Sequence, residues 1–177
     1  MPGRSVRAVV LLLVASSLAA GCSNYHFVRT NEPLGSVRRV AVRTLVNNSY
    51  EPGLDLLVTD ALRREFRRHG LVLVADPAQA DLVLAGTVLD LHTTTRSFSS
   101  IAFSLEYQVQ LTIQLAATLA DGKTLPIDPT ALSEWELYLT SSDVEAERRN
   151  RDEALRRLAS VLASRVQESL AQRLTEP

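Results

Sequence analysis

The sequence predicts a two-layer α+β domain, a sandwich of two amphipathic helices packed on one face of a four- or five-stranded mixed β-sheet. Two observations support this fold class. One long segment carries an apolar residue at every second position, which is typical of a strand with one buried face. Two other segments carry apolar residues at helical spacing. The expected order is strand, helix, four strands and a final helix, with the apolar side of the sheet turned toward the helices.

The first strand is expected over residues 37–46 (VRRVAVRTLV), and the first helix follows between Pro52 and Gly70. Proline suits the first turn of a helix, and glycine suits the position after its last turn. Apolar residues in this segment recur three and four positions apart, as in a stripe that faces a sheet. The stripe consists of Leu54, Leu57, Val58, Ala61, Leu62 and Phe66. The arginines that flank it, Arg63, Arg64, Arg67 and Arg68, are expected to form a solvated helix face.

The longest strand is expected over residues 103–119, because every second residue there is apolar. At about 3.4 Å per residue, such a strand would be roughly 58 Å long. It must therefore bend or extend beyond the core as a hairpin arm. Residues 80–95 are its expected antiparallel partner, across the loop RSFSS, and Asp121–Gly122 supplies the next turn. The inward-facing residues are Phe103, Leu105, Tyr107, Val109, Leu111, Ile113, Leu115, Ala117 and Leu119.

Three shorter predictions complete the domain. Residues 71–75 (LVLVA) are a further strand, and residues 132–140 alternate again, with Trp135, Leu137 and Leu139 on one side. The second helix is expected to begin near Ser142–Asp143 and to run toward Leu174. Its apolar stripe is Leu155, Leu158, Val161, Leu162, Val166, Leu170 and Leu174.

The first residues have the order of a secretory signal peptide: a basic start with Arg4 and Arg7, an apolar stretch over residues 8–18, and small residues before Cys22. The apolar stretch is too short to cross a membrane, which needs about 20 residues. An amphipathic terminus is the alternative interpretation. We expect residues 1–21 to be removed, residues 22–36 to form a tether, and residues 37–174 to form a single domain.

Cys22 is the only cysteine, so it has no partner for a disulfide within the chain. The sequence AAGC resembles the lipobox of bacterial lipoproteins, in which the cysteine becomes the lipidated N-terminus. Buried acyl chains contribute about 0.8 kcal/mol per methylene, and two or more chains hold a protein firmly. Ser23 at the next position resembles an outer-membrane sorting signal. The expected location is the bacterial outer membrane, with Cys22 as a lipid (palmitate-type) anchor and the domain on the periplasmic side.

The outward side of the longest strand carries hydroxyl and amide groups, and Glu106 is its only charge. Desolvating an amide costs far less free energy than desolvating a charge, so such a face suits contact with another polar protein surface. The alternative is an ordinary solvated sheet face. The candidate partner-facing residues are Ser104, Gln108, Gln110, Thr112 and Gln114.

The ordered set of a lipobox, VRRVAVRTLVNNSYEPGLDLLVTDALRREF, ADLVLAGTV and EYQVQLTIQLAATLADG resembles the LptE family of lipopolysaccharide-assembly lipoproteins. The resemblance covers essentially the whole chain after the leader. It implies a non-enzymatic outer-membrane lipoprotein that sits as a plug inside the β-barrel protein LptD, where the two deliver lipopolysaccharide to the cell surface. The lumen of such a barrel is polar, in agreement with the neutral outward face.

The same resemblance implicates basic residues at the tip of the long hairpin and ahead of the last helix in binding anionic lipopolysaccharide. The matching residues are Arg96 at the tip and, less securely aligned, Arg148 and Arg149. Phe98 and Ile101 flank the tip and are candidates for contact with acyl chains. Ordinary surface charge is the alternative interpretation for each arginine.

Several classes of function are disfavoured. The formal net charge of −1 gives no overall field that would select nucleic acid. His26, His69 and His92 lack metal-ligand spacing, and the chain has no phosphate-binding glycine loop or nucleophile elbow. We therefore expect no enzyme, metal or cofactor. Two alternatives stay open: a lipoprotein of similar fold that activates a cell-wall synthase or forms a secretion pore, and a periplasmic hydrolase assembled from distant residues.

Overall fold

The computed structural model describes residues 34–98 and 104–175. The predicted signal peptide and Cys22 lie outside these residues, as do Ile101 and Phe103. Within them the sheet has seven strands, namely β1 (Arg39–Val42), β2 (Val46–Asn47), β3 (Val72–Leu73), β4 (Leu82–Phe98), β5 (Ser104–Leu119), β6 (Thr124–Leu125) and β7 (Ser133–Leu139). The helices are α2 (Leu54–Arg68) and α3 (Val144–Thr175), with short 3₁₀ turns η2 (Pro77–Gln79) and η3 (Pro129–Leu132).

The sheet is mixed, as predicted. Strands β3, β1 and β4 are parallel neighbours, whereas β4, β5 and β7 are antiparallel neighbours. Strand β2 pairs with β4, and β6 pairs with β5. The sheet has more strands than the predicted four or five because β2 and β6 have only two residues each, too few to show an alternating pattern.

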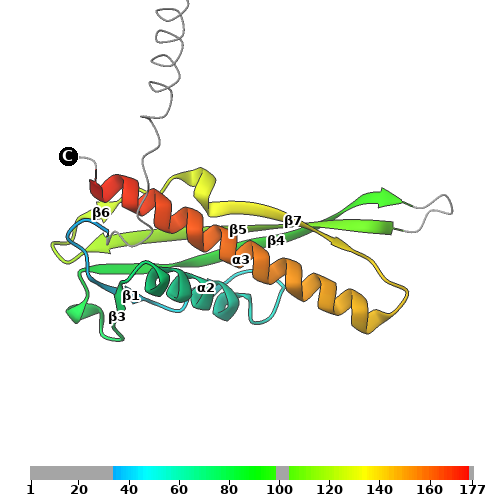
Figure 1. The fold of residues 1–177 in the computed structure, drawn as a ribbon, viewed down its shortest axis with the longest axis horizontal. Helices are drawn as coiled ribbons and strands as arrows, with labels where there is room; N and C mark the ends of the chain where they lie inside the picture. The colour runs from blue at the N-terminus through cyan, green and yellow to red at the C-terminus, as the bar shows by residue number, and fades with distance from the viewer. Residues whose placement is uncertain (1–33, 99–103, 176–177) are drawn as a thin grey trace, which may run out of the picture. The chain divides into compact units, whose positions relative to one another are not determined.

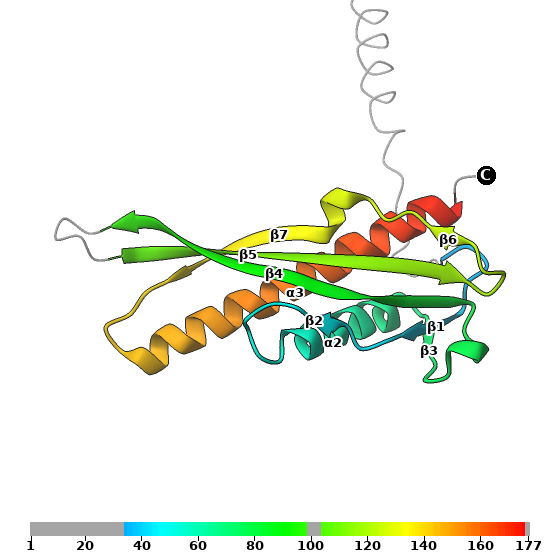
Figure 2. The same ribbon diagram turned by 180° about the vertical axis from the view of Figure 1, so that it is seen from behind.

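Both helices cover the same face of the sheet. Figure 1 shows α2 and α3 in front of the strands, and Figure 2 shows the strands in front of the helices. The predicted two-layer architecture is therefore confirmed. The core between the layers includes Phe66 of α2, Leu84 of β4, Leu111 of β5 and Leu158 of α3, all essentially inaccessible to solvent.

The predicted helical stripes are confirmed with one correction. Val161 of α3 is 39% exposed, whereas Ala159 and Ala163 are buried beside Leu158 and Leu162. The buried face of α3 is thus turned toward its alanines, which allow close packing against α2 and the sheet. Leu174, at the end of the predicted stripe, is partly buried against the core.

The ends of the helices are fixed by local chemistry. Gly70 has φ +77°, and the following residue, Leu71, donates its N–H to the carbonyl of Phe66 at 3.1 Å, which closes α2 as predicted. Pro52 lies before the helix rather than in its first turn, because Gly53 occupies the cap position in a left-handed conformation. Asp143 caps α3, accepting the N–H of Glu145 at 2.9 Å.

The predicted strand over residues 37–46 is interrupted. Its backbone leaves the sheet at Leu45, whose N–H donates to the hydroxyl of Thr59 on α2 at 3.1 Å. That hydroxyl in turn donates to the carbonyl of Asp55 at 2.6 Å. A continuous strand would have paired the N–H of Leu45 with a neighbouring strand. In the structure the buried Thr59 side chain accepts that N–H instead.

The length of the β4–β5 hairpin predicted that it would bend or extend, and it does both. Its register shifts between Val88 and Asp90 and again between Thr95 and Ser97, and such bulges bend a strand. Around Val88 the inward side chains are buried under the helices, whereas residues 92–96 are exposed throughout. The described part of this outer segment, residues 92–98 with the facing part of β5, is here called the arm and is visible in Figure 2.

Candidate partner-binding face of the sheet

The face of the sheet that the helices leave uncovered is the candidate functional site, and it is here called the open face. Because side chains alternate along a strand, residues that are register partners on neighbouring strands lie on the same face. Gln110 of β5 is the partner of His92 on β4 and of Trp135 on β7. The described residues at the centre of this face are Asp90, His92, Thr94, Gln108, Gln110, Thr112, Gln114, Ser133, Trp135, Leu137 and Leu139.

The centre of the open face is polar and joined by side-chain hydrogen bonds. The Gln110 amide donates to the hydroxyl of Ser133 at 3.1 Å, and the Thr112 hydroxyl lies 3.2 Å from the same oxygen. Gln110 and Gln114 are exposed, and Gln108 and Thr112 are half-buried. The predicted row of neutral polar residues thus points away from the helices, although the side chain of Ser104 is not among those described.

The apolar side chains of β7 lie on the open face rather than against the helices. Trp135 is 52% exposed, Leu137 36% and Leu139 59%. The alternating pattern placed these three residues correctly on one side of the strand, but the expectation that the apolar side faces the helices is wrong for β7. These three residues are here called the apolar stripe.

Two ion pairs join the side of β7 opposite the stripe to α3. Glu136 accepts a hydrogen bond from the Arg157 guanidinium at 2.9 Å. A nitrogen of Arg165 lies 2.6 Å from the Glu134 carboxylate, an ion pair whose angles do not make a hydrogen bond. The side of β7 that carries these two carboxylates therefore faces α3, and the stripe faces outward.

Tyr138 is the aromatic residue on the covered side of β7. It is 7% exposed, and its ring centroid lies 5.4 Å from that of Tyr107 on β5. Burial raises the pKa of the Tyr138 phenol above its usual value. This contact and the two ion pairs fix β7 against the rest of the molecule and so fix the position of the stripe.

The apolar stripe lies at a margin of the sheet. Strand β7 pairs with β5 along one edge, and among the described strands none pairs with its other edge. The register places Gln110 opposite Trp135 and Gln108 opposite Leu137, so the polar centre and the stripe adjoin. Exposed large apolar side chains that cluster in this way mark contact surfaces more often than single exposed ones do.

The predicted lipopolysaccharide-binding residues come from separate elements. Arg96 is exposed in the arm, at the bulge between Thr95 and Ser97. Phe98 ends β4, and its side chain is not among those described, while Ile101 lies outside the described residues. The end of the arm and the first turn of α3 lie apart in both views (Figures 1 and 2).

Arg148 and Arg149 are exposed in the first turns of α3. The Arg148 guanidinium donates to the Glu145 carboxylate at 2.9 Å, and this hydrogen bond raises the pKa of Arg148. Part of its charge is therefore already balanced by a neighbouring side chain, which makes Arg148 a weaker candidate for binding an anion than Arg96.

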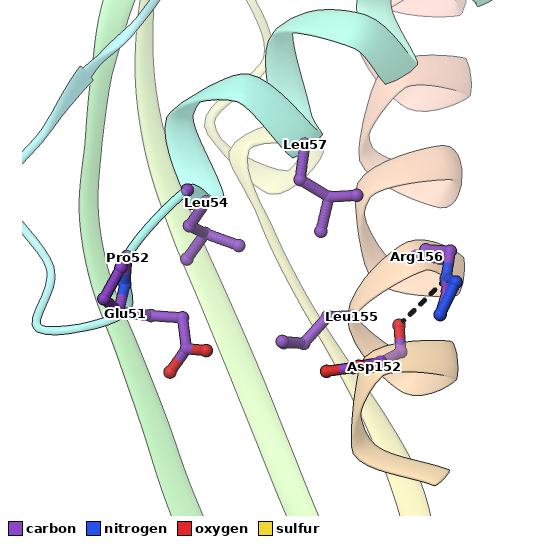
Figure 3. Close-up of a pocket in the computed structure, with 8 residues that line it drawn as sticks. Glu51, Pro52, Leu54, Leu57, Asp152, Leu155 and Arg156 are labelled. Atoms are coloured by element: carbon purple, nitrogen blue, oxygen red, sulfur yellow. Dashed lines mark hydrogen bonds between the residues drawn. The ribbon is translucent and has the colours of Figure 1, made fainter. Parts of the chain in front are cut away.

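A hollow of about 300 Å³ lies between the start of α2 and the first half of α3 (Figure 3). Leu57 and Leu155 line it, together with the charged residues Glu51, Asp152 and Arg156. Glu51 accepts two hydrogen bonds from Arg151, at 2.9 and 2.6 Å, and these lower the pKa of the carboxyl. Arg156 donates to the backbone carbonyl of Asp152 at 3.4 Å. The hollow is a seam between α2 and α3, beside the ion pair between Glu51 and Arg151.

Two further properties bear on function. In the ranges 34–98 and 104–175, no three His, Cys, Asp or Glu side chains gather closely enough to hold a metal ion. None of the helices in those ranges is long and apolar enough to cross a membrane.

Comparison with known proteins gives a family and a fold. A family model described as LptE, lipopolysaccharide-assembly, matches residues 37–170. The crystal structure of the rare lipoprotein B from Shewanella oneidensis is 18% identical, covers 76% of this chain and 95% of its own, and superposes with a TM-score of 0.54. A hypothetical protein from Chlamydia trachomatis is 12% identical, covers 78% and 98%, and gives a TM-score of 0.51. No curated protein sequence matches. At these identities the structural likeness supports the α+β fold alone.

Proposed function

Because this chain belongs to the LptE family of lipopolysaccharide-assembly proteins, we propose that it is an outer-membrane lipoprotein that plugs and assists an LptD-type β-barrel. Its role lies in lipopolysaccharide assembly, and the family is non-enzymatic. In the proposed arrangement the open face meets the inner wall of the barrel, and the arm extends toward the lipopolysaccharide.

The observation that carries the proposal is the chemistry of the open face. The lumen of a large outer-membrane barrel is polar, and the centre of the open face presents amide and hydroxyl groups that can exchange water for such a wall at low cost. Of its central residues, Asp90 is the acidic one, and Glu106 follows toward the arm. A surface with this composition suits enclosure by protein.

The apolar stripe is better suited to contact with a protein partner than to exposure to solvent. Trp135 offers a large ring at the margin of the sheet, and tryptophan is prominent among residues that dominate binding energy at interfaces. The strands of a closed barrel have no free edge. The stripe would therefore contact the barrel through side-chain packing rather than by adding a strand to its wall.

The proposed anchor is the lipidated Cys22, which would place the domain on the periplasmic side of the outer membrane. Residues 22–36 would then connect the anchor to β1, the first strand of the domain. Two or more acyl chains would make the attachment firm.

The proposed lipopolysaccharide contacts are Arg96, with Phe98 and Ile101 beside it, and secondarily Arg148 and Arg149. The Arg96 guanidinium is exposed at the end of the hairpin that reaches beyond the helices. A planar guanidinium binds phosphate and carboxylate groups through two hydrogen bonds, which suits an anionic glycolipid.

Photo-cross-linking tests the barrel contact. A photoreactive residue at Gln110 or Trp135 should link the protein to an outer-membrane barrel, which should also co-purify after detergent extraction. The matched control is Leu56, which is 55% exposed on α2, the helix that lies on the other face of the sheet (Figures 1 and 2). Equal cross-linking from Leu56, or isolation of a barrel-free monomer or ring, would contradict the proposal.

Lipopolysaccharide binding by the purified protein tests the arm. The variant Arg96→Ala should weaken binding by about tenfold, since a charge-assisted hydrogen bond contributes about 1.5–3 kcal/mol. Lys123→Ala is the matched control, because Lys123 is an exposed cation at the other end of the β4–β5 hairpin. Unchanged binding in Arg96→Ala would remove the arm from the proposed contact.

A further inference from the structure

The groove at the edge of the sheet opposite β7 has a chemistry different from that of the open face. It lies where the parallel strands β1 and β3 end, beside α2, and has a volume of about 530 Å³. Strand β3 follows β1 through α2 on one side, while β4 lies on the other side of β1. In parallel sheets, crevices that bind ligands form at the carboxyl ends of strands where the strand order changes direction.

The lining of this groove combines two arginines with apolar side chains. Arg43 follows β1, and Arg63 reaches in from α2. Of the described residues that line it, none is acidic. The remaining lining residues are Ala41, Val42, Thr44, Leu73, Val74, Ala75 and Pro77.

The sequence predicted that Arg63 belongs to a solvated helix face. The structure corrects this, because the Arg63 side chain is held in place by a hydrogen bond. Its guanidinium donates to the carbonyl of Val42, at the end of β1, at 2.9 Å. One of its nitrogens also lies 3.5 Å from a carboxylate oxygen of Asp60, which is itself largely exposed. The cation is thus fixed at the rim of the groove, with only a long, solvated ion pair to balance it.

Arg43 is positioned by its backbone. Its N–H donates to the carbonyl of Leu84 on β4 at 2.9 Å, while its side chain is exposed. Among residues 34–98 and 104–175, no carboxylate forms an ion pair with it. The nearby acid Asp76 instead accepts the backbone N–H of Ala78 at 2.9 Å.

We propose that this groove binds the phosphate group of an anionic amphiphile, with Arg43 and Arg63 on the phosphate and the side chains of Leu73, Val74, Ala75 and Pro77 against the apolar part. Two guanidinium groups with little local compensation favour a phosphate, which accepts hydrogen bonds from a guanidinium in pairs. The apolar wall favours a ligand that carries hydrocarbon next to its phosphate. The site depends on neither the barrel partnership nor the arm.

Two sources share this chemistry, namely lipopolysaccharide and anionic phospholipid, and binding experiments distinguish them. The full-length protein in non-ionic detergent is titrated with lipopolysaccharide, with dephosphorylated lipopolysaccharide, with phosphatidylglycerol or phosphatidylcholine in mixed micelles, and with inorganic pyrophosphate. All titrations are repeated in the Arg96→Ala background, so that contacts at the arm do not mask the groove.

The variants Arg43→Gln and Arg63→Gln should each weaken binding of the phosphorylated amphiphile by about tenfold or more. Arg64→Gln is the matched control, because it removes the same charge from the neighbouring position of α2, outside the groove, and should change affinity less than about twofold. Arg43→Gln leaves the hydrogen bond between Arg63 and Val42 intact, so the test holds even if Arg63→Gln perturbs folding.

Three results would overturn the proposal. One is an equal effect of Arg43→Gln and Arg64→Gln. Another is equal affinity for phosphorylated and dephosphorylated amphiphiles. The third is pyrophosphate binding as tightly as the amphiphile, because the apolar wall would then contribute nothing. Absence of barrel cross-linking at Gln110 or Trp135 would contradict the proposed barrel partnership but would not affect the proposal for the groove.

Discussion

Strands β5 and β7 are antiparallel neighbours with the same alternation of apolar and polar residues, yet they are oriented in opposite ways. In β5, the apolar Val109 and Leu111 are buried, and the polar Gln110 between them is exposed. In β7, the apolar Trp135 is 52% exposed, while its neighbour Glu134 turns toward α3, where its side chain is 13% exposed.

The difference teaches that alternation defines two faces of a strand but not which of them is covered. For β5, the apolar side gains free energy by packing under the helices. For β7, the side that faces α3 carries the buried Tyr138 and two glutamates, which pair with Arg157 and Arg165 of α3. The identity of the facing helix residues decides the orientation.

The largest expected effect comes from truncating a leucine on each strand. Leu111→Ala on β5 removes a side chain with no solvent exposure and should lower the free energy of unfolding by about 2–5 kcal/mol. Leu139→Ala on β7 should change it by about 0.5 kcal/mol at most, because that side chain is 59% exposed. Urea denaturation followed by circular dichroism measures both, and equal losses would contradict the comparison.

The next largest effect tests the ion pair that orients β7. Arg165→Ala leaves the Glu134 carboxylate without its cation and should lower the free energy of unfolding by about 1–3 kcal/mol. Adding Glu134→Leu to that variant should restore most of the loss, since it removes the carboxylate that would otherwise stay buried without its cation. Additive losses in the double variant would show that the pair does not hold the strand.

A smaller effect concerns the ion pair that holds α3 near Tyr138. The hydrogen bonds from Arg151 lower the pKa of the Glu51 carboxyl, so its contribution to stability is complete above the usual glutamate pKa. That contribution is lost as the pH falls through the lowered value. Between neutral and acid pH the loss should be about 1 kcal/mol at most. Glu51→Gln should remove this part of the pH dependence, and denaturation at several pH values in both proteins measures it.

The smallest effect on folding is expected at the apolar stripe itself. Trp135→Gln should change the free energy of unfolding by about 0.5 kcal/mol or less, because half of the side chain is already in solvent. The same variant should reduce co-purification of the barrel, if the stripe is a contact surface. A large loss of stability would instead show that Trp135 belongs to the core, and that β7 resembles β5 after all.

Sequence and structure agree where a pattern is long. The alternation over residues 103–119 predicted β5, its antiparallel partner and a bent, extended hairpin, and the helical stripes predicted α2 and α3. They differ where an element is short or interrupted. Strands β2 and β6 have two residues each, and the strand over residues 37–46 breaks where Leu45 donates its N–H to Thr59. The residues around Leu45 contain no pattern that predicts a hydrogen bond to Thr59, because Thr59 belongs to a helix later in the chain.

The candidate site divides in the same way. The neutral row of Gln108, Gln110, Thr112 and Gln114 was predicted, because its members share one strand. The apolar stripe was recognised as one side of a strand but assigned no role, and the groove of Arg43 and Arg63 was missed. Arg63 had the pattern of a solvated helix residue, and only the end of β1 gave it a partner.

The sequence by itself determined the two-layer class, the long hairpin, both amphipathic helices and family membership, because each depends on periodicity or on ordered local motifs. The tertiary structure alone decided which side of β7 faces solvent and that Arg63 of α2 lies beside Arg43 at the end of β1. The physical reason is that an ion pair or a shared groove depends on residues distant in the chain. The sequence around one of these residues does not indicate which distant residue it will contact.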